Sequence, residues 1–252
     1  SFVSSAIAKK AAELAVADPA IMERAMHGML QREYRQQGNR EAIAGIAVQE
    51  LGGAEICDFK EEVSEDWLSK FGTYASDVCS DDLRMLFGKT LASEIEKPNT
   101  VSISTLHFTS MLDPESTALI QRVLGFVDSH GMFYQEMLDP ALSHLDLVRL
   151  EQCGFWTTGK TLPVEFKASE FTFFKLFDNR AFAVKSEATF SESLQISLLS
   201  RAGLDLAKVL KPDFAASAFA DLWEVKKPGI ECYLGKLNSA GEMDSSSIKR
   251  IN

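Results

Sequence analysis

The stretch that decides the fold covers residues 66–106. D-W-L-S-K-F at 66–71 is followed by S-D-D-L-R-M-L-F-G-K-T-L-A-S-E-I-E-K-P at 80–98 and by S-I-S-T-L at 102–106. Apolar side chains in the second segment recur every three or four residues, which is the period of an amphipathic helix. Ser80 stands where a helix N-cap is expected, and Pro98 stands where a helix must stop. The stretch therefore predicts a helix at the centre of a helical core.

Similar start signals surround that helix, because small polar residues or Asp-Pro pairs precede other segments with a helical period. We predict that helices begin at Asp18-Pro19, Asn39, Ser64, Ser80, Ser102 and Asp113-Pro114. The helix from Asn39 is expected to end at Gly52-Gly53. Together these segments predict an orthogonal helical bundle in a first domain, residues 1–139.

After residue 140 the period changes. A helix from Asp139-Pro140 is expected to stop at Gly154, and two aromatic and aliphatic runs around D-N-R at 178–180 predict a β-hairpin. Residues 195–199 and 229–234 predict further strands, and Ser200 and Pro212 each begin a helix. The expected fold is therefore mainly α, with a second, small α+β domain at residues 140–252. Both a winged-helix-like module and a generic α+β domain fit this order of elements.

Charge is distributed unevenly along the chain. The whole net charge of −10 arises in residues 1–140, which hold 22 acidic and 12 basic residues. Residues 141–252 hold 14 of each and are neutral. An acidic surface repels phosphate backbones, which argues against non-specific nucleic-acid binding by the first domain. No apolar run approaches the roughly 20 residues of a membrane span, so we expect no such span and a cytoplasmic location.

Several short motifs resemble a family of bacterial proteins of unknown function, with a more distant likeness to abortive-infection, or phage-defence, proteins. They are D-W-L-x-x-F from Asp66, L-A-S-E-I from Leu91, Pro98, S-x-x-T-L from Ser102 and L-x-x-x-G-x-x-L from Leu199. Family-like positions are Arg32, Arg35, Asn39, Asp66, Trp67, Glu94 and Pro98. Phe87 and Ser93 depart from the pattern, which often has Trp and Gly there. The resemblance implies no established activity and links the chain to phage defence by likeness alone.

Motifs that bind metals or cofactors are absent from the sequence. Cys57, Cys79, Cys153 and Cys232 form no C-x-x-C pair, which favours reduced thiols packed as small apolar groups. The four histidines have no metal-binding spacing, and neither a nucleophile elbow nor a P-loop is present. We therefore expect no metal and no cofactor.

Carboxylates around the tryptophan-bearing segment are the weak catalytic candidates. Asp66, Asp77 and Glu94 could bind Mg²⁺ or perform acid–base chemistry if they converged, as in a metal-dependent nuclease or nucleotide hydrolase. The favoured interpretation is structural, because acids commonly cap helices and form salt bridges. A buried Glu94 paired with Arg32 or Arg35 is the specific expectation.

DNA binding by the second domain is another alternative. Arg149 would lie on the recognition helix of a winged helix, and Lys175, Arg180 and Lys185 would lie along its hairpin. The equal number of acids there opposes it, since phosphate neutralisation usually needs an excess of Lys and Arg.

Surplus apolar faces support the leading hypothesis, a non-catalytic interaction or regulatory protein. Phe171, Phe173, Phe174 and Phe177 make the hairpin apolar on both faces, so that it needs a cover. Alanines that permit close helix approach recur at Ala6, Ala8, Ala11, Ala12, Ala15 and Ala17. We therefore expect a protein partner or self-association into an oligomer.

Overall fold

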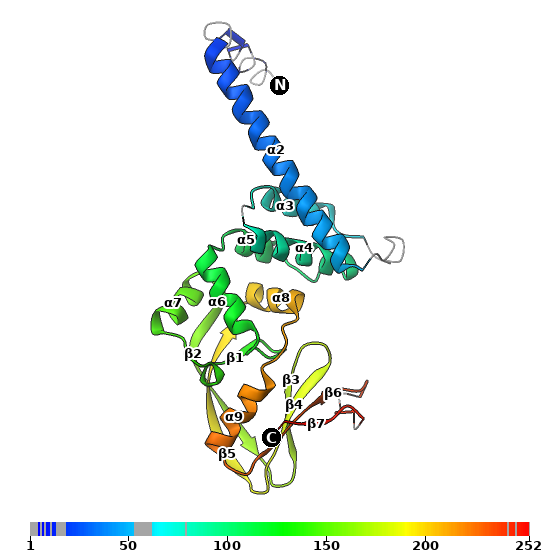
Figure 1. The fold of residues 1–252 in the computed structure, drawn as a ribbon, viewed down its shortest axis with the longest axis vertical. Coiled ribbons are helices and arrows are strands. Elements are labelled where there is room, and N and C mark those ends of the chain that lie inside the picture. The colour runs from blue at the N-terminus through cyan, green and yellow to red at the C-terminus, as the bar shows by residue number, and fades with distance from the viewer. Residues whose placement is uncertain are drawn as a thin grey trace.

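The computed structural model describes residues 5, 7, 9–10, 12–13, 19–52, 62–78, 80–240, 242–244 and 246–251. Helices are α2 (Pro19–Glu50), α3 (Glu65–Ser76), α4 (Asp81–Glu96), α5 (Ile103–Ser110), α6 (Pro114–Leu124), α7 (His144–Gln152), α8 (Arg201–Leu210) and α9 (Ala216–Lys226), with a 3-10 turn, η2 (Gln135–Met137). Strands are β1 (Met132–Tyr134), β2 (Trp156–Phe166), β3 (Phe171–Lys175), β4 (Arg180–Lys185), β5 (Phe190–Leu199), β6 (Glu231–Lys236) and β7 (Lys249–Arg250). A helical N-terminal region thus precedes a region that contains sheets, and the chain is not purely helical (Figure 1).

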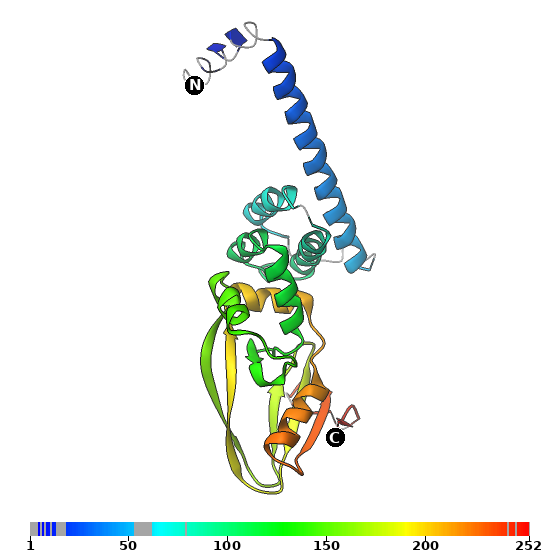
Figure 2. The same cartoon turned by 60° about the vertical axis from the view of Figure 1, so that its left-hand side comes forward.

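Helix α2 is continuous over 32 residues, so the prediction of two helices meeting at Asn39 is wrong. Asn39 is buried inside the helix, where its side-chain Nδ2 donates to the carbonyl oxygen of Ser76 over 2.8 Å. Its amide is satisfied by tertiary partners, and it caps nothing. The first half of α2 projects away from the other helices (Figure 2). Asp18 and Gly53, which the sequence assigns to helix ends, lie outside the described residues, as do Ala6, Ala8, Ala11, Ala15 and Ala17.

Three of the six helix starts predicted in the helical region are confirmed as side-chain caps. The side chains of Ser80, Ser102 and Asp113 accept hydrogen bonds from the backbone N–H groups of Leu83, Thr105 and Ser116, at the starts of α4, α5 and α6. Ser64 precedes α3 without a side-chain cap. Packing joins α2, α3, α4 and α5 around one apolar cluster, whose fully buried members include Ile43, Phe87 and Leu106. Helix α6 packs in a second cluster, through Ile120, Val123 and Leu124.

Two antiparallel sheets form the C-terminal region, with strand orders β1-β5-β2 and β3-β4-β6-β7. The predicted hairpin is confirmed: β3 pairs with β4 from Phe171 opposite Lys185 to Lys175 opposite Ala181. Asp178 and Asn179 make its turn with left-handed φ values of 58° and 54°, which asparagine and aspartate tolerate. The predicted strand at 195–199 lies in β5, and Ser200 caps α8 as expected.

Three details of the C-terminal prediction are wrong. Helix α7 begins at His144 behind a Ser143 capping box rather than at Asp139-Pro140, and α9 begins at Ala216 rather than at Pro212. Strand β2 was not predicted. The boundary between residues 139 and 140 stays a prediction, although β1, which precedes it, pairs with β5, which follows it. The winged-helix-like arrangement also stays a prediction.

Helix α9 and both sheets share one aromatic core. The ring of Phe219 lies 4.8 Å from that of Tyr134 and 4.9 Å from those of Phe174 and Phe182, measured between centroids. The hairpin aromatics divide: Phe174 and Phe177 are buried, whereas Phe171 and Phe173 are 43% and 47% exposed. One face of the hairpin is therefore covered from within the chain. Among the described residues, no helix is both long enough and apolar enough to cross a membrane.

Candidate functional site

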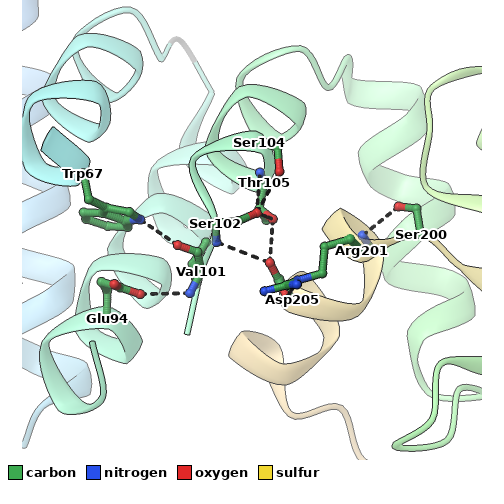
Figure 3. A network of polar contacts seen from close by, with 10 residues as sticks. Trp67, Glu94, Val101, Ser102, Ser104, Thr105, Ser200, Arg201 and Asp205 are labelled. Atoms are coloured by element: carbon green, nitrogen blue, oxygen red, sulfur yellow. Dashed lines mark hydrogen bonds and ion pairs between the residues drawn. The ribbon is translucent and has the colours of Figure 1, made fainter. Parts of the chain in front are cut away.

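Family-like residues of three segments meet at the turn between α4 and α5 (Figure 3). The buried carboxylate of Glu94 accepts hydrogen bonds from the backbone N–H groups of Asn99 (2.6 Å) and Val101 (2.9 Å). The indole Nε1 of Trp67 donates to the carbonyl oxygen of Val101 over 2.7 Å. Asn99 has φ 67°, a left-handed conformation that asparagine tolerates. Two side chains therefore fix the turn that follows Pro98.

A second buried carboxylate, that of Asp205 in α8, holds the start of α5. Its Oδ2 accepts from the Thr105 hydroxyl over 2.8 Å and from the Ser102 backbone N–H over 3.3 Å. Its Oδ1 accepts from Nε of Arg201 over 3.0 Å, and Arg201 is otherwise largely exposed. A buried charge is costly unless it is paired and hydrogen-bonded, and here both conditions are met. Asp205 thus ties the C-terminal α8 to the helical region.

The expected pairing of Glu94 with Arg32 or Arg35 is wrong. Both arginines lie on the exposed part of α2, and Nη2 of Arg35 is 4.0 Å from Oδ1 of Asp77. Glu94 instead lies beneath the loop, where backbone N–H groups satisfy both of its oxygens. The partners of Glu94 are thus N–H groups five and seven residues farther along the chain, and not a guanidinium group of α2.

The weak catalytic candidates are not brought together. Asp66 is exposed in the first turn of α3, and Asp77 follows the last turn of that helix, roughly 16 Å farther along its axis. Glu94 is buried on α4 with both oxygens engaged. Within the described ranges, no group of three or more His, Cys, Asp or Glu side chains could hold a metal ion.

Three of the four residues proposed to contact DNA are engaged by other side chains of the chain. Arg149 of α7 pairs with Glu115, and Arg180 pairs with Asp213 over 3.2 Å. The Lys185 ammonium lies over the ring of Phe171, 5.7 Å from its centroid. The ammonium of the fourth residue, Lys175, has no such partner among the described residues.

A third buried carboxylate, Asp128, shapes the turn before β1, and no motif in the sequence pointed to it. Its Oδ1 accepts from the N–H groups of His130 and Met132, each over 2.9 Å, and its Oδ2 accepts from the Tyr134 hydroxyl over 2.9 Å. Burial raises the pKa of the Asp128 carboxyl, and these hydrogen bonds and His130 partly oppose that rise. Burial, together with the neighbouring Asp128 charge, also raises the pKa of Tyr134.

A family model described as "Protein of unknown function (DUF2806)" matches residues 23–138, from the first turns of α2 to just past η2. The match covers Trp67, Glu94 and the α4–α5 turn, and it agrees with the resemblance to a family of unknown function. It ends before Asp205. Neither the curated proteins nor the solved structures contain a match to this chain.

The two described cysteines, Cys153 and Cys232, are free thiols packed at least partly within the fold. Cys232 is buried in the aromatic core, and burial raises the pKa of its thiol to about 12. Cys153 is half-buried, and burial raises its thiol pKa as well. Both thiols are therefore neutral near pH 7 and poor nucleophiles. Cys57 and Cys79 lie outside the described residues.

Taken together, the buried carboxylates of α4, α8 and the turn before β1 hold turns and helix starts in place. The carboxylates of Glu94, Asp128 and Asp205 each accept at least two hydrogen bonds, and each is at most 2% exposed. These hydrogen bonds occupy acceptor positions that a bound ion would need. The arrangement favours a structural role for them.

Proposed function

We propose that this chain is a non-catalytic interaction protein that self-associates through α2. The observation that carries the proposal is an apolar face on the projecting half of α2, called here the α2 stripe. The stripe consists of Met22, Ala25, Met26, Met29 and Leu30, whose large side chains are between 44% and 62% exposed. These positions follow the three- and four-residue spacing of one helix face. A contiguous exposed apolar face of this kind marks an interaction site.

A second copy of the chain is the occupant that the charges favour. The molecule is strongly acidic overall, so two copies repel each other over most of their surfaces. Residues 19–38 hold three arginines and two glutamates, a net charge of +1, and this part of the helical region can approach its own copy without that penalty. Methionine suits such a contact because its flexible side chain adapts to an irregular partner surface. A twofold pair would bury the same stripe on both copies.

The oligomeric state tests this proposal. We expect light scattering after size exclusion to give a dimer mass for the wild type and a monomer mass for the double variant Met26→Glu/Met29→Glu. Glutamate is a good helix former, so α2 keeps its helix while its apolar face gains charge. Leu145→Glu in α7 is the matched control, because Leu145 is 78% exposed and far along the chain from the stripe. This control should remain a dimer.

Two results would contradict self-association through the α2 stripe. One is equal mass for the wild type and the double variant. The other is a wild-type monomer that binds lipid vesicles through the stripe, which would assign α2 to a membrane surface.

We further propose phage defence in the bacterial cytoplasm as the process in which the interaction acts, on the ground of the resemblance to abortive-infection proteins. Cells that express the wild type should survive phage challenge better than cells that express Met26→Glu/Met29→Glu at equal protein level. Equal survival would separate the self-association from any defence role.

The competing hypotheses have their own decisive variants. For a metal-dependent nuclease or nucleotide hydrolase, turnover with Mg²⁺ should be lost in Glu94→Gln. For a DNA-binding regulator with a winged-helix-like C-terminal region, a salt-dependent shift of duplex DNA should be lost in Arg149→Ala. Glu94 is buried and accepts two hydrogen bonds, which weighs against the enzyme hypothesis. The ion pair between Arg149 and Glu115 weighs against the DNA-binding hypothesis.

A further inference from the structure

A basic cleft lies where the helical region meets the hairpin. Its volume is about 720 Å³, and its charged lining is Lys97 after α4, Lys175 at the end of β3, Lys208 in the last turn of α8 and Asp178 in the hairpin turn. We call it the lysine cleft. Three segments that are far apart in the sequence thus deliver a lysine to one place.

The three ammonium groups lack the partners that lysines usually have in an acidic protein. All three residues are exposed, and none has an ion pair or a side-chain hydrogen bond within the part of the chain that the structure describes. Like charges gathered in one cleft repel each other, and Asp178 balances only one of the three. The lining therefore carries a local net charge of +2 in a chain whose net charge is −10.

A second cleft of the same molecule shows the contrast. It has a volume of about 530 Å³ and is lined by Lys185 and Arg250 together with Glu187, Glu224 and Glu231. Arg250 and Glu231 form an ion pair of 2.8 Å there. The acids of this second cleft neutralise its cations, whereas the lysine cleft retains an excess of positive charge.

We propose that the lysine cleft binds a small ligand that carries two or more linked phosphate groups, such as an inorganic polyphosphate or a nucleoside triphosphate. Three ammonium groups around one cavity match the charge of such a ligand, since lysine binds phosphate oxygens as a mobile point charge. The volume lies within the range of small-molecule sites.

One neutral donor, the side-chain amide of Asn238, also lines the cleft. Oδ1 of Asn238 accepts from the N–H groups of Ala240 and Glu242, over 2.9 Å and 3.0 Å, so its Nδ2 remains as a donor. The hydroxyl of Ser129 donates to the carbonyl oxygen of Lys175 over 2.9 Å, which holds the β3 end of the cleft in place. Leu176, Phe177 and Leu237 supply apolar surface.

A small ligand fits the charges better than a nucleic-acid strand does. A strand would extend its phosphates beyond the cleft onto an acidic molecule and would be repelled there. A compact polyphosphate would place its charge inside the cleft, where the lysines lie. The inference does not depend on pairing through α2.

Isothermal titration calorimetry with sodium triphosphate at about 50 mM salt tests the proposal, since low salt favours charge-dependent binding. We expect saturable binding of triphosphate, weaker binding of pyrophosphate and the weakest binding of orthophosphate. The triple variant Lys97→Gln/Lys175→Gln/Lys208→Gln should lose affinity by about tenfold or more, because it removes all three charge-assisted contacts.

The matched control is Lys70→Gln/Lys160→Gln/Lys249→Gln, which removes three exposed lysines outside the cleft lining and changes the net charge equally. It should bind triphosphate within about twofold of the wild type, because the cleft is intact. Circular dichroism verifies that both variants are folded. Absence of saturable wild-type binding, equal loss in both triple variants, or binding of a single-stranded oligonucleotide but not of triphosphate would each overturn the proposal.

Discussion

The helical region and the sheet region are held together by different kinds of side chain. In the sheet region, rings from both sheets and from α9 pack against one another, with Phe219 at their centre. In the helical region, a smaller apolar cluster is supplemented by the carboxylates of Glu94 and Asp205, which bind backbone N–H groups at the start and end of a single turn. Apolar burial is non-directional, whereas each carboxylate contact fixes one atom against another. We therefore expect apolar packing to dominate the stability of the sheet region, and the carboxylate contacts to fix the position of the α4–α5 turn in the helical region.

Removal of the central ring of the aromatic core should have the strongest effect on stability. Phe219→Ala should lower the free energy of unfolding by about 3–5 kcal/mol, because the ring is fully buried and its removal leaves a cavity. Urea denaturation followed by circular dichroism measures this loss. Phe173→Ala, on the exposed face of the hairpin, is the control and should cost less than about 1 kcal/mol. Similar losses in the two variants would mean that the aromatic core is not the main source of stability.

A smaller loss of stability is expected when the buried carboxylate that holds the start of α5 is removed. Asp205→Ala should lower the free energy of unfolding by about 2–3 kcal/mol, because the buried hydroxyl of Thr105 and the N–H of Ser102 lose their acceptor. Hydrogen exchange should accelerate at the amides that begin α5 and remain slow in β4. Asp205→Asn, which keeps an oxygen acceptor and the side-chain shape, should cost less. Uniform acceleration over both regions would show that Asp205 acts on global stability and not on one joint.

The smallest effect concerns Asp128, the polar exception beside the aromatic core. Burial raises the folded-state pKa of its carboxyl above the ordinary 3.8, so the folded chain binds this proton more readily than the unfolded chain does. Its contribution to stability should therefore grow as the pH falls through the folded-state pKa toward 3.8, and should be lost as the pH rises through that pKa. The stability of the wild type relative to Asp128→Asn should increase over that acidic range.

His130 must be removed from this measurement, since its Nδ1 lies 3.8 Å from Oδ2 of Asp128 and its protonation favours the charged carboxylate. We therefore place both proteins in a His130→Asn background and measure denaturation at several pH values. A flat difference between the two would contradict a raised pKa.

Features with local causes could be predicted from the sequence. Ser80, Ser102, Asp113 and Ser200 each cap a helix through an N–H group three residues away, so a short window contains both partners. The β3–β4 hairpin was predictable for the same reason. Asn39 has the residue type of a cap, and the prediction failed because its partners, Ser76 and Arg84, are supplied by other helices.

Features with distant causes were missed. Asp205 reaches Thr105 across 100 residues, and the lysine cleft joins segments from α4, the hairpin and α8. Strand β2 contains Gly159 and Pro163, which normally argue against a strand. These two residues are tolerated because β2 lies at a sheet edge, where it pairs with β5. The pairing also has a register shift between Thr157 and Lys160.

Gly203 combines a signal that is visible in the sequence with a cause that is tertiary. The motif L-x-x-x-G-x-x-L singled it out in the sequence, but the reason is tertiary. A Cβ at this position would lie 2.4 Å from the carbonyl oxygen of Phe155, so only glycine allows α8 to approach that loop.

The length of α2 sets a stand-off distance for whatever contacts its stripe. Met26 precedes Asn39, the first buried side chain of the helix, by 13 residues, which places it roughly 20 Å along the axis from that anchor. At physiological ionic strength, electrostatic fields in solvent decay over a Debye length of about 8 Å. Met26, in the middle of the stripe, thus lies more than two such lengths from the first anchored turn, and salt there largely screens the acidic body. Contacts at the stripe should be nearly insensitive to added salt, unlike the phosphate binding proposed for the lysine cleft.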